Sequence, residues 1–149
     1  MNLETNTAET ETSLFANSYD KEVYLDNLTY SRGRTMKAIF MIAAIFFIGD
    51  LIGSFSSRAE FTGMVFIYII FFPVIFMGLG FLARKNPMLA IVIAMILFAG
   101  IITINVIAYG GSSLFKGILI KAVVVYLLIS GYNHAKDAAI AKENLAALG

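Results

Sequence analysis

The sequence predicts an all-α integral membrane protein with four transmembrane helices in an antiparallel bundle. Hydrophobic residues make up 59% of the 149-residue chain and charged residues only 14%, against about a quarter in a typical soluble domain. Four segments reach the ~20 apolar residues that a helix needs to cross a bilayer core of ~30 Å. These apolar runs are continuous rather than alternating, which excludes the strands of a membrane barrel.

The four predicted spans cover residues 36–55, 61–83, 88–109 and 114–132 and form a membrane domain of residues 35–132. Short segments rich in polar residues, glycine or proline separate them: "SSRAE", "RKNP" and "GGSS". The connections are too short for any further domain. Because they are so short, consecutive spans must run in opposite directions through the membrane.

The distribution of Lys and Arg predicts that both ends of the chain lie in the cytoplasm. Basic residues accumulate in the short cytoplasmic flanks of membrane proteins. One side of the predicted bundle carries only Arg58 and Lys116, whereas the other carries eight basic residues: Lys21, Arg32, Arg34, Lys37, Arg84, Lys85, Lys136 and Lys142. The compact loops and the absence of cysteine favour the cytoplasmic (inner) membrane of a bacterium.

Residues 1–34 are predicted to form a cytoplasmic N-terminal segment. Its first part, 1–13, is rich in Thr and Glu and offers little to bury, so disorder is expected there. Residues 17–30 fit either a short helix at the membrane surface or a loosely ordered linker. Since this end lacks the basic and apolar regions of a secretory signal, the first span is expected to direct membrane insertion.

Residues 133–149 are predicted to extend the fourth helix into the cytoplasm as a helical tail. Ala138, Ala141, Leu145 and Leu148 follow the spacing of a narrow apolar seam. Two heptads are too few to indicate a coiled coil. The seam therefore packs on a partner, packs on the N-terminal segment, or frays in water.

Ionisable side chains inside a membrane are costly and require a partner or an aqueous cavity. Asp50 and Lys121 are two such residues, and counting 1.5 Å per helical residue puts both in the outer half of the bilayer. Tyr68 and Asn105 fall at a similar depth, so a polar cluster with one residue from each helix is expected. The Asp50–Lys121 pair is either a structural pin or a functional gate. Alternatively, Lys121 extends to the outer interface without meeting Asp50.

Small residues four apart mark positions where membrane helices can approach closely. Gly49 and Gly53 form such a pair on the first span, and Ala90 and Ala94 form one on the third. The glycine pair marks either a contact with another subunit or, as the simpler interpretation, packing inside one bundle.

The sequence contains no recognisable catalytic, cofactor-binding or metal-binding constellation. His134 is the single histidine, and there is no cysteine, so neither a zinc site nor a thiolate nucleophile can be assembled from one chain. No phosphate-binding loop or nucleophile elbow is present, and nothing indicates nucleic acid as a partner. The interpretation is a protein that is not an enzyme.

Two functional hypotheses follow from the residues. The first is a non-catalytic accessory or assembly subunit, or an interaction protein, of a complex in the cytoplasmic membrane. The second is a small oligomeric carrier or channel for an ion or solute that uses the Asp50–Lys121 charge pair. The expected partners are the lipid bilayer and either a larger membrane complex or further copies of the chain.

Overall fold

The computed structural model describes residues 3–56, 63–111 and 117–148, with side chains mainly over 18–52, 69–107 and 117–148. It contains the helices α1 (Leu3–Ser56), α2 (Gly63–Leu82), α3 (Pro87–Tyr109) and α4 (Ile118–Ala147). Within these ranges there is no strand, which confirms the all-α class.

Three of the helices are long and apolar enough to cross a membrane, which indicates a membrane protein. They are the described parts of α1, α3 and α4: Ser18–Ile52, Pro87–Ile107 and Ile118–Ala147. The part of α2 with described side chains, Ile69–Leu82, is a shorter apolar helix.

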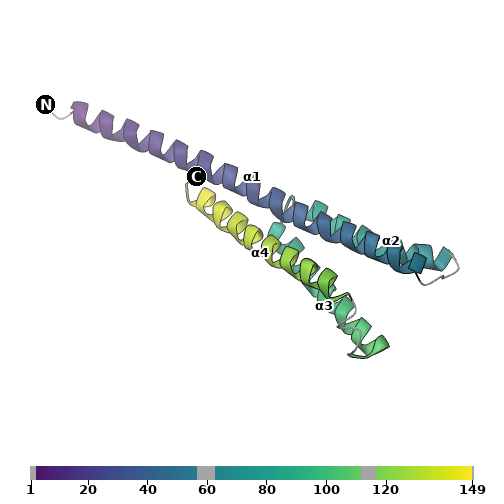
Figure 1. Ribbon diagram of the computed structural model, residues 1–149. Coiled ribbons are helices and arrows are strands. Elements are labelled where there is room, and N and C mark those ends of the chain that lie inside the picture. The colour runs from purple at the N-terminus through teal and green to yellow at the C-terminus, as the bar shows by residue number, and fades with distance from the viewer. Residues whose placement is uncertain (1–2, 57–62, 112–116, 149) are drawn as a thin grey trace.

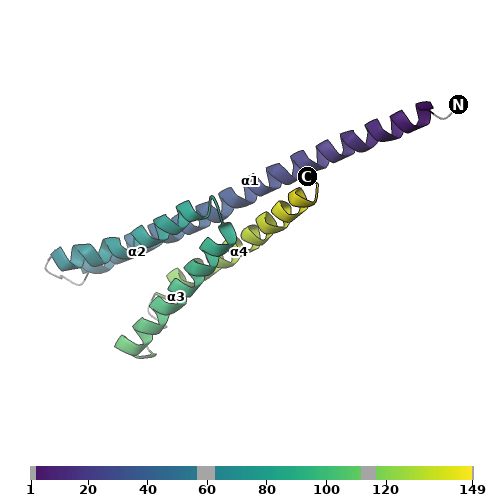
Figure 2. The ribbon, with the colours of Figure 1, turned by 180° about the vertical axis from the view of Figure 1, so that it is seen from behind.

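The helices form two hairpins that meet at one end and separate at the other (Figures 1 and 2). One hairpin is α1 with α2, and the other is α3 with α4. The most extensive contact between any two helices joins α1 to α4, which run antiparallel across the hairpins. Neighbouring helices alternate in direction as predicted, but the arrangement is open where α1 and α3 end.

Helix α1 is continuous over 54 residues, which differs from the sequence prediction of disorder over 1–13 and at most a short helix over 17–30. No glycine or proline precedes Gly33, so nothing in the sequence interrupts the backbone hydrogen-bond ladder. Beyond the membrane domain, α1 also gains a packing partner, since Leu28 and Ser31 are buried.

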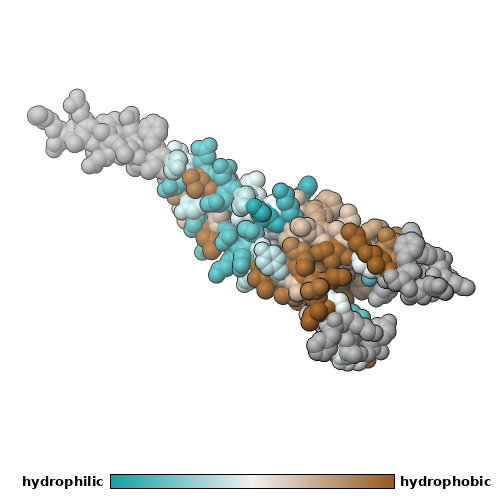
Figure 3. All heavy atoms as spheres, in the orientation of Figure 1, coloured by the Kyte–Doolittle hydropathy of each residue, from teal (hydrophilic) through white to brown (hydrophobic). Residues whose placement is uncertain are grey.

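That partner is the C-terminal part of α4. Leu28 forms a small apolar cluster with Ala138 and Ala141, and Leu145 packs against it. Of the three alternatives for the C-terminal seam, the structure thus has the seam packed on the N-terminal segment. Hydrophilic residues cover this paired end of α1 and α4, whereas hydrophobic residues cover the surface towards the open end (Figure 3).

The main core joins all four helices near the middle of the membrane domain. Its fully buried residues include Ile42 of α1, Phe76 of α2 and Ile91 of α3, and Val124 of α4 is almost as deeply buried. The ring of Phe46 stacks on Phe76, with the ring centroids 5.2 Å apart. The core is therefore aromatic and aliphatic, and dispersion contacts hold it together.

Helices α1, α3 and α4 approach closely at Gly131. A Cβ built on this glycine would lie 2.9 Å from Ile91 Cδ1 and 3.3 Å from Ala38 Cβ, closer than side chains normally approach. Thr35, which is fully buried, places its Oγ1 3.0 Å from the Ser31 carbonyl oxygen and 3.2 Å from that of Gly131. Its hydroxyl thus donates to backbone carbonyls at the α1–α4 crossing.

The small residues singled out in the sequence have different surroundings. Ala90 and Ala94 are fully buried in the core. A Cβ built on Gly49 would meet nothing within 4 Å, so this glycine does not mark a close approach of helices inside the chain. The surroundings of Gly53 lie outside the described residues.

Replacing Gly131 by valine should destabilise the fold, because the added side chain has no room between Ile91 and Ala38. We expect a loss of about 1 to 3 kcal/mol, the usual cost of overpacking a core. Thermal unfolding of the purified protein in detergent micelles measures it. Gly100→Val is the matched control, since a Cβ at Gly100 meets nothing within 4 Å. Equal losses in both variants would contradict the close crossing.

Replacing Thr35 by valine should remove the hydroxyl at the crossing with little change in shape. Hydrogen bonds between membrane helices contribute about 0.5 to 1.5 kcal/mol, and we expect a loss in that range. Thr103→Val is the control, because Thr103 is exposed and its Oγ1 bonds only the Ala99 carbonyl of its own helix, at 2.9 Å. In the same unfolding measurement, the control should lose little stability. A larger loss of stability in Thr103→Val than in Thr35→Val would refute the role of the Thr35 hydroxyl at the crossing.

Candidate intramembrane polar site

Three of the four residues predicted to form a polar cluster lie at the open end of the molecule. Asp50 precedes the end of α1 by less than two turns, Asn105 lies in the last two turns of α3, and Lys121 lies in the first turn of α4. Helices α1 and α3 end, and helices α2 and α4 begin, at this same end of the molecule (Figure 1). The alternation of helix direction therefore brings three sequence-distant polar residues to one level.

Asp50, Asn105 and Lys121 line one cavity of about 210 Å³. All three side chains are half-buried. The walls between them are apolar and include Phe98 and Val124, which belong to the main core. The cavity therefore has a hydrophobic base and a polar rim contributed by three helices.

The size and composition of this cavity allow it to hold water or a small polar group. Liquid water occupies ~30 Å³ per molecule, so there is room for several waters. A carboxylate, an amide and an ammonium group supply both donors and acceptors to such guests. Inside an apolar layer this combination would attract ions or polar side chains that the surrounding lipid excludes.

Gly49 also lines the cavity, one residue before Asp50. With open space around its Cβ position, its effect is to leave the cavity wall without a side chain. This differs from the predicted alternative in which Gly49 packs inside one bundle, whereas a contact with another subunit stays a prediction. Within the chain, the glycine beside Asp50 leaves the cavity wider.

The fourth predicted member, Tyr68, belongs to α2, and its side chain lies outside the described residues. The described lining of the cavity comes from α1, α3, α4 and Gly117, the residue that precedes α4. Asp50 and Lys121 share this cavity, and their direct pairing stays a prediction.

Sequence reasoning used Arg32, Lys85 and Lys142 only to orient the chain, but the structure gathers them around a second cavity at the opposite end. The contact of Leu28 with Ala138 and Ala141 brings this part of α1 beside α4. Arg32 lies one turn from that contact on α1, and Lys142 follows Ala141 directly on α4, so both reach one cavity. No local sequence pattern indicated this meeting, because it depends on how α4 packs on α1.

His134 also acquires a neighbour that the sequence did not indicate. Its ring meets the ring of Tyr30 edge-on, with centroids 6.2 Å apart. The Arg34 guanidinium also lies over the Tyr30 ring, 5.1 Å from its centroid. Arg34 Nε donates a hydrogen bond to the Tyr30 hydroxyl at 2.9 Å. This arrangement packs the α1–α4 pair outside the membrane domain.

The shared cavity predicts a cross-linking result. The chain contains no cysteine, so Asp50→Cys and Lys121→Cys can be introduced together as the only thiols. We expect a short bis-maleimide to join them within one chain, which peptide mass spectrometry detects. As control, Phe47→Cys with Lys121→Cys should not cross-link, because Phe47 is exposed and lines a different groove, between α1 and α2. Cross-linking in the control alone would place Asp50 away from the cavity.

Comparison with known proteins yields no match to this chain: no protein-family model, no curated protein and no solved structure matches it. Inference about its function therefore starts from its own cavities, charges and surfaces. Two features stand out among the described residues, namely the polar cavity at the open end and the basic cavity at the closed end.

Proposed function

We propose that the chain is a multi-pass protein of the cytoplasmic membrane with four spans and both ends in the cytoplasm. Helix α2 supports a fourth span, since its 20 residues rise ~30 Å, the thickness of a bilayer core. Arg32, Lys85 and Lys142 support the orientation, because they gather at the end where the hairpins meet.

Within that membrane, we propose a role as a non-catalytic accessory or assembly subunit of a larger complex. The observation that supports it is the position of the polar cavity. Asp50, Asn105 and Lys121 are half-buried at the end where the two hairpins separate, and the described residues leave their cavity open. Charged groups in a membrane rarely face lipid. A helix of another chain, entering between the hairpins, would cover them.

The contact with such a helix would be polar as well as apolar. In lipid there is no hydrophobic drive for helices to associate, so close packing and interhelical hydrogen bonds supply the affinity. A hydroxyl, amide or charged side chain on the partner would find donors and acceptors in the cavity. The partner is either a different membrane protein or a second copy of this chain.

The same cavity also favours a second candidate, a small oligomeric carrier or channel. Room for several waters beside a carboxylate and an ammonium group is what a gate for an ion or a proton requires. Protonation of Asp50, or an ion bound to it, would release Lys121 and shift the packing of α1 against α4. In this case oligomerisation would complete the pathway.

The experiment that tests the first role is the mass and composition of the complex extracted from its native membrane in a mild detergent or lipid particle. We expect a stoichiometric larger partner, and we expect Asp50→Asn to lower its recovery several-fold. Asp20→Asn is the control, because Asp20 is an exposed carboxylate on α1 outside the cavity.

The outcomes separate the two candidates. If Asp50→Asn weakens assembly and apolar replacement of both Asp50 and Lys121 restores it, the pair has a structural role in the complex. If the protein is recovered alone or as a homo-oligomer, and Asp50→Asn abolishes ion flux in vesicles without changing assembly, the carrier function holds. Unchanged assembly and unchanged flux in the single variants would refute both roles of the pair.

A further inference from the structure

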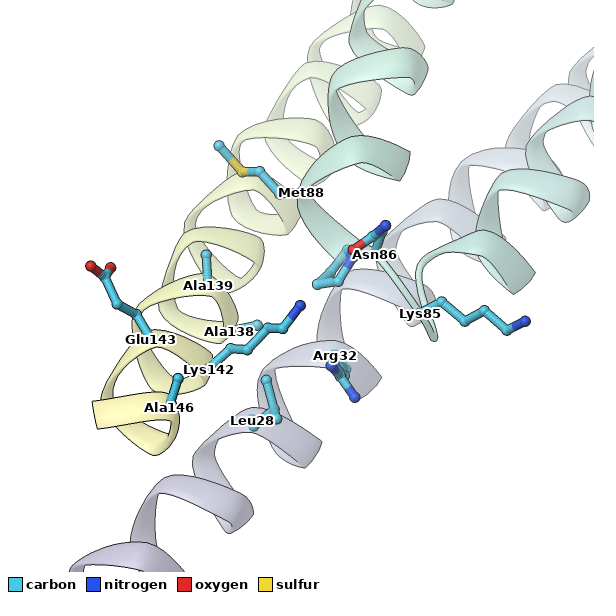
Figure 4. A pocket seen from close by; sticks show the side chains of 11 residues that line it. Leu28, Arg32, Lys85, Asn86, Met88, Ala138, Ala139, Lys142, Glu143 and Ala146 are labelled. Carbon is cyan, nitrogen blue, oxygen red and sulfur yellow. The ribbon is translucent and has the colours of Figure 1, made fainter. Parts of the chain in front are cut away.

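A second cavity lies at the opposite end of the molecule from Asp50, where the two hairpins meet. Its volume is about 320 Å³. Three segments far apart in the sequence form it: α1 around Arg32, the α2–α3 turn with the start of α3, and α4 around Lys142 (Figure 4).

Basic side chains predominate around this cavity. Arg32, Lys85 and Lys142 line it, against the single carboxylate of Glu143. In Figure 4 the Lys142 side chain extends from α4 across the gap towards Asn86, and Glu143 points away from the gap. Lys85 extends outwards from the turn, and its long exposed side chain can reorient. The electrostatic preference of the cavity is therefore for an anion.

Arg32 carries a buried donor that the chain does not satisfy. Its Nε is inaccessible to solvent and has no hydrogen-bond partner. Buried polar groups almost always have a partner, and an unsatisfied donor on a charged guanidinium is especially unfavourable. Planar guanidinium groups bind phosphate through two parallel hydrogen bonds. Because Nε is inaccessible to solvent, the half-buried Arg32 side chain must move to bring this donor to an anionic oxygen in the cavity, and the anion would then supply the missing partner.

The start of α3 adds to the same preference. The helix begins at Pro87, and its preceding residue Asn86 makes no capping hydrogen bond with its side chain. The first intrahelical bond is the one from the Ala90 amide to the Asn86 carbonyl, at 3.1 Å. The Asn86 amide donates to the Leu82 carbonyl and Pro87 has none, so the Met88 and Leu89 amides and the positive end of the helix dipole are available to an anion.

We propose that this cavity binds the phosphate group of an anionic phospholipid. Arg32 lies four residues before the first predicted span, which corresponds to the level of lipid headgroups. An exposed apolar row on α3, formed by Leu89, Val92 and Ile96, begins one residue after the lining residue Met88. This row on the helix that begins at the cavity offers a surface for an acyl chain, which free phosphate lacks.

The site shares no residue with the cavity at Asp50, so the two can be tested separately. It depends on the proposed membrane insertion, but not on a partner chain or on transport. A variant that loses lipid binding is expected to assemble like the wild type through the cavity at Asp50. Conversely, Asp50→Asn is expected to keep its lipid binding.

The test uses the full-length protein in detergent micelles with equimolar phosphatidylglycerol and phosphatidylcholine of matched acyl chains, analysed by native mass spectrometry. The wild type should retain phosphatidylglycerol preferentially. Arg32→Gln combined with Lys142→Gln should lower this preference by about fivefold for each charge removed, since each basic residue near an anionic surface contributes about 1 kcal/mol.

Matched controls separate a built site from general surface charge. Lys37→Gln combined with Lys136→Gln removes the same charge from the same two helices, and both residues are exposed and outside the cavity. This control should keep its lipid preference. An equal loss in the Lys37/Lys136 control would overturn the proposal.

Two further measurements keep the proposal falsifiable. If the double variant does not fold, Lys142→Gln alone replaces it, because Lys142 is exposed and its removal leaves the core intact; an undiminished preference in that variant would overturn the site. Inorganic phosphate in large excess should fail to displace phosphatidylglycerol. Displacement by inorganic phosphate would identify a free-phosphate site and refute the lipid assignment.

Discussion

The close crossing of α1 and α4 at Gly131 is the contact on which the rest of the structure depends. It is the position where a side chain on α4 would collide with both Ile91 of α3 and Ala38 of α1. The buried hydroxyl of Thr35 lies 3.2 Å from the Gly131 carbonyl oxygen, which adds a polar contact to the steric one. In a membrane, where helices gain nothing from leaving water, contacts of this kind fix which helices pair.

One tight crossing explains why the molecule is open at one end. Since α1 and α4 approach closely at Thr35 and Gly131, the two hairpins can diverge beyond this crossing (Figure 1). The aromatic core around Phe46 and Phe76 fills the space on the α1–α2 side. Beyond that core the described side chains leave a cavity between the helices, and polar residues line it. The open end thus follows from packing that is concentrated on one side.

The sequence predicts the apolar helices well, because lipid imposes a length and a composition that can be read residue by residue. It also predicts the level at which Asp50, Asn105 and Lys121 lie, since helix rise and alternating direction determine it. It does not predict the position of the crossing. Gly131 and Ala135 have the same small-residue spacing as Gly49 and Gly53, and only the packing of three helices distinguishes them.

The continuity of α1 escaped prediction for a related reason. The Thr- and Glu-rich start has no apolar face of its own, and propensity alone gives marginal helices in water. What stabilises the region near Leu28 is the tail of α4, more than a hundred residues away in the sequence. A long-range contact of this kind leaves only a weak local trace, the narrow seam of Ala138 and Ala141.

The two charged cavities are placed as a membrane protein requires. Eighteen residues of uninterrupted helix α1 separate Arg32 from Asp50, a rise of about 27 Å. If Asp50 lies in the outer half of a bilayer core ~30 Å thick, helix geometry puts Arg32 at the inner headgroup level. Helix α4 contributes Lys142 to the first of these cavities and Lys121 to the second. One pair of helices that cross at Gly131 therefore contributes to both cavities, and moving either cavity requires moving both helices.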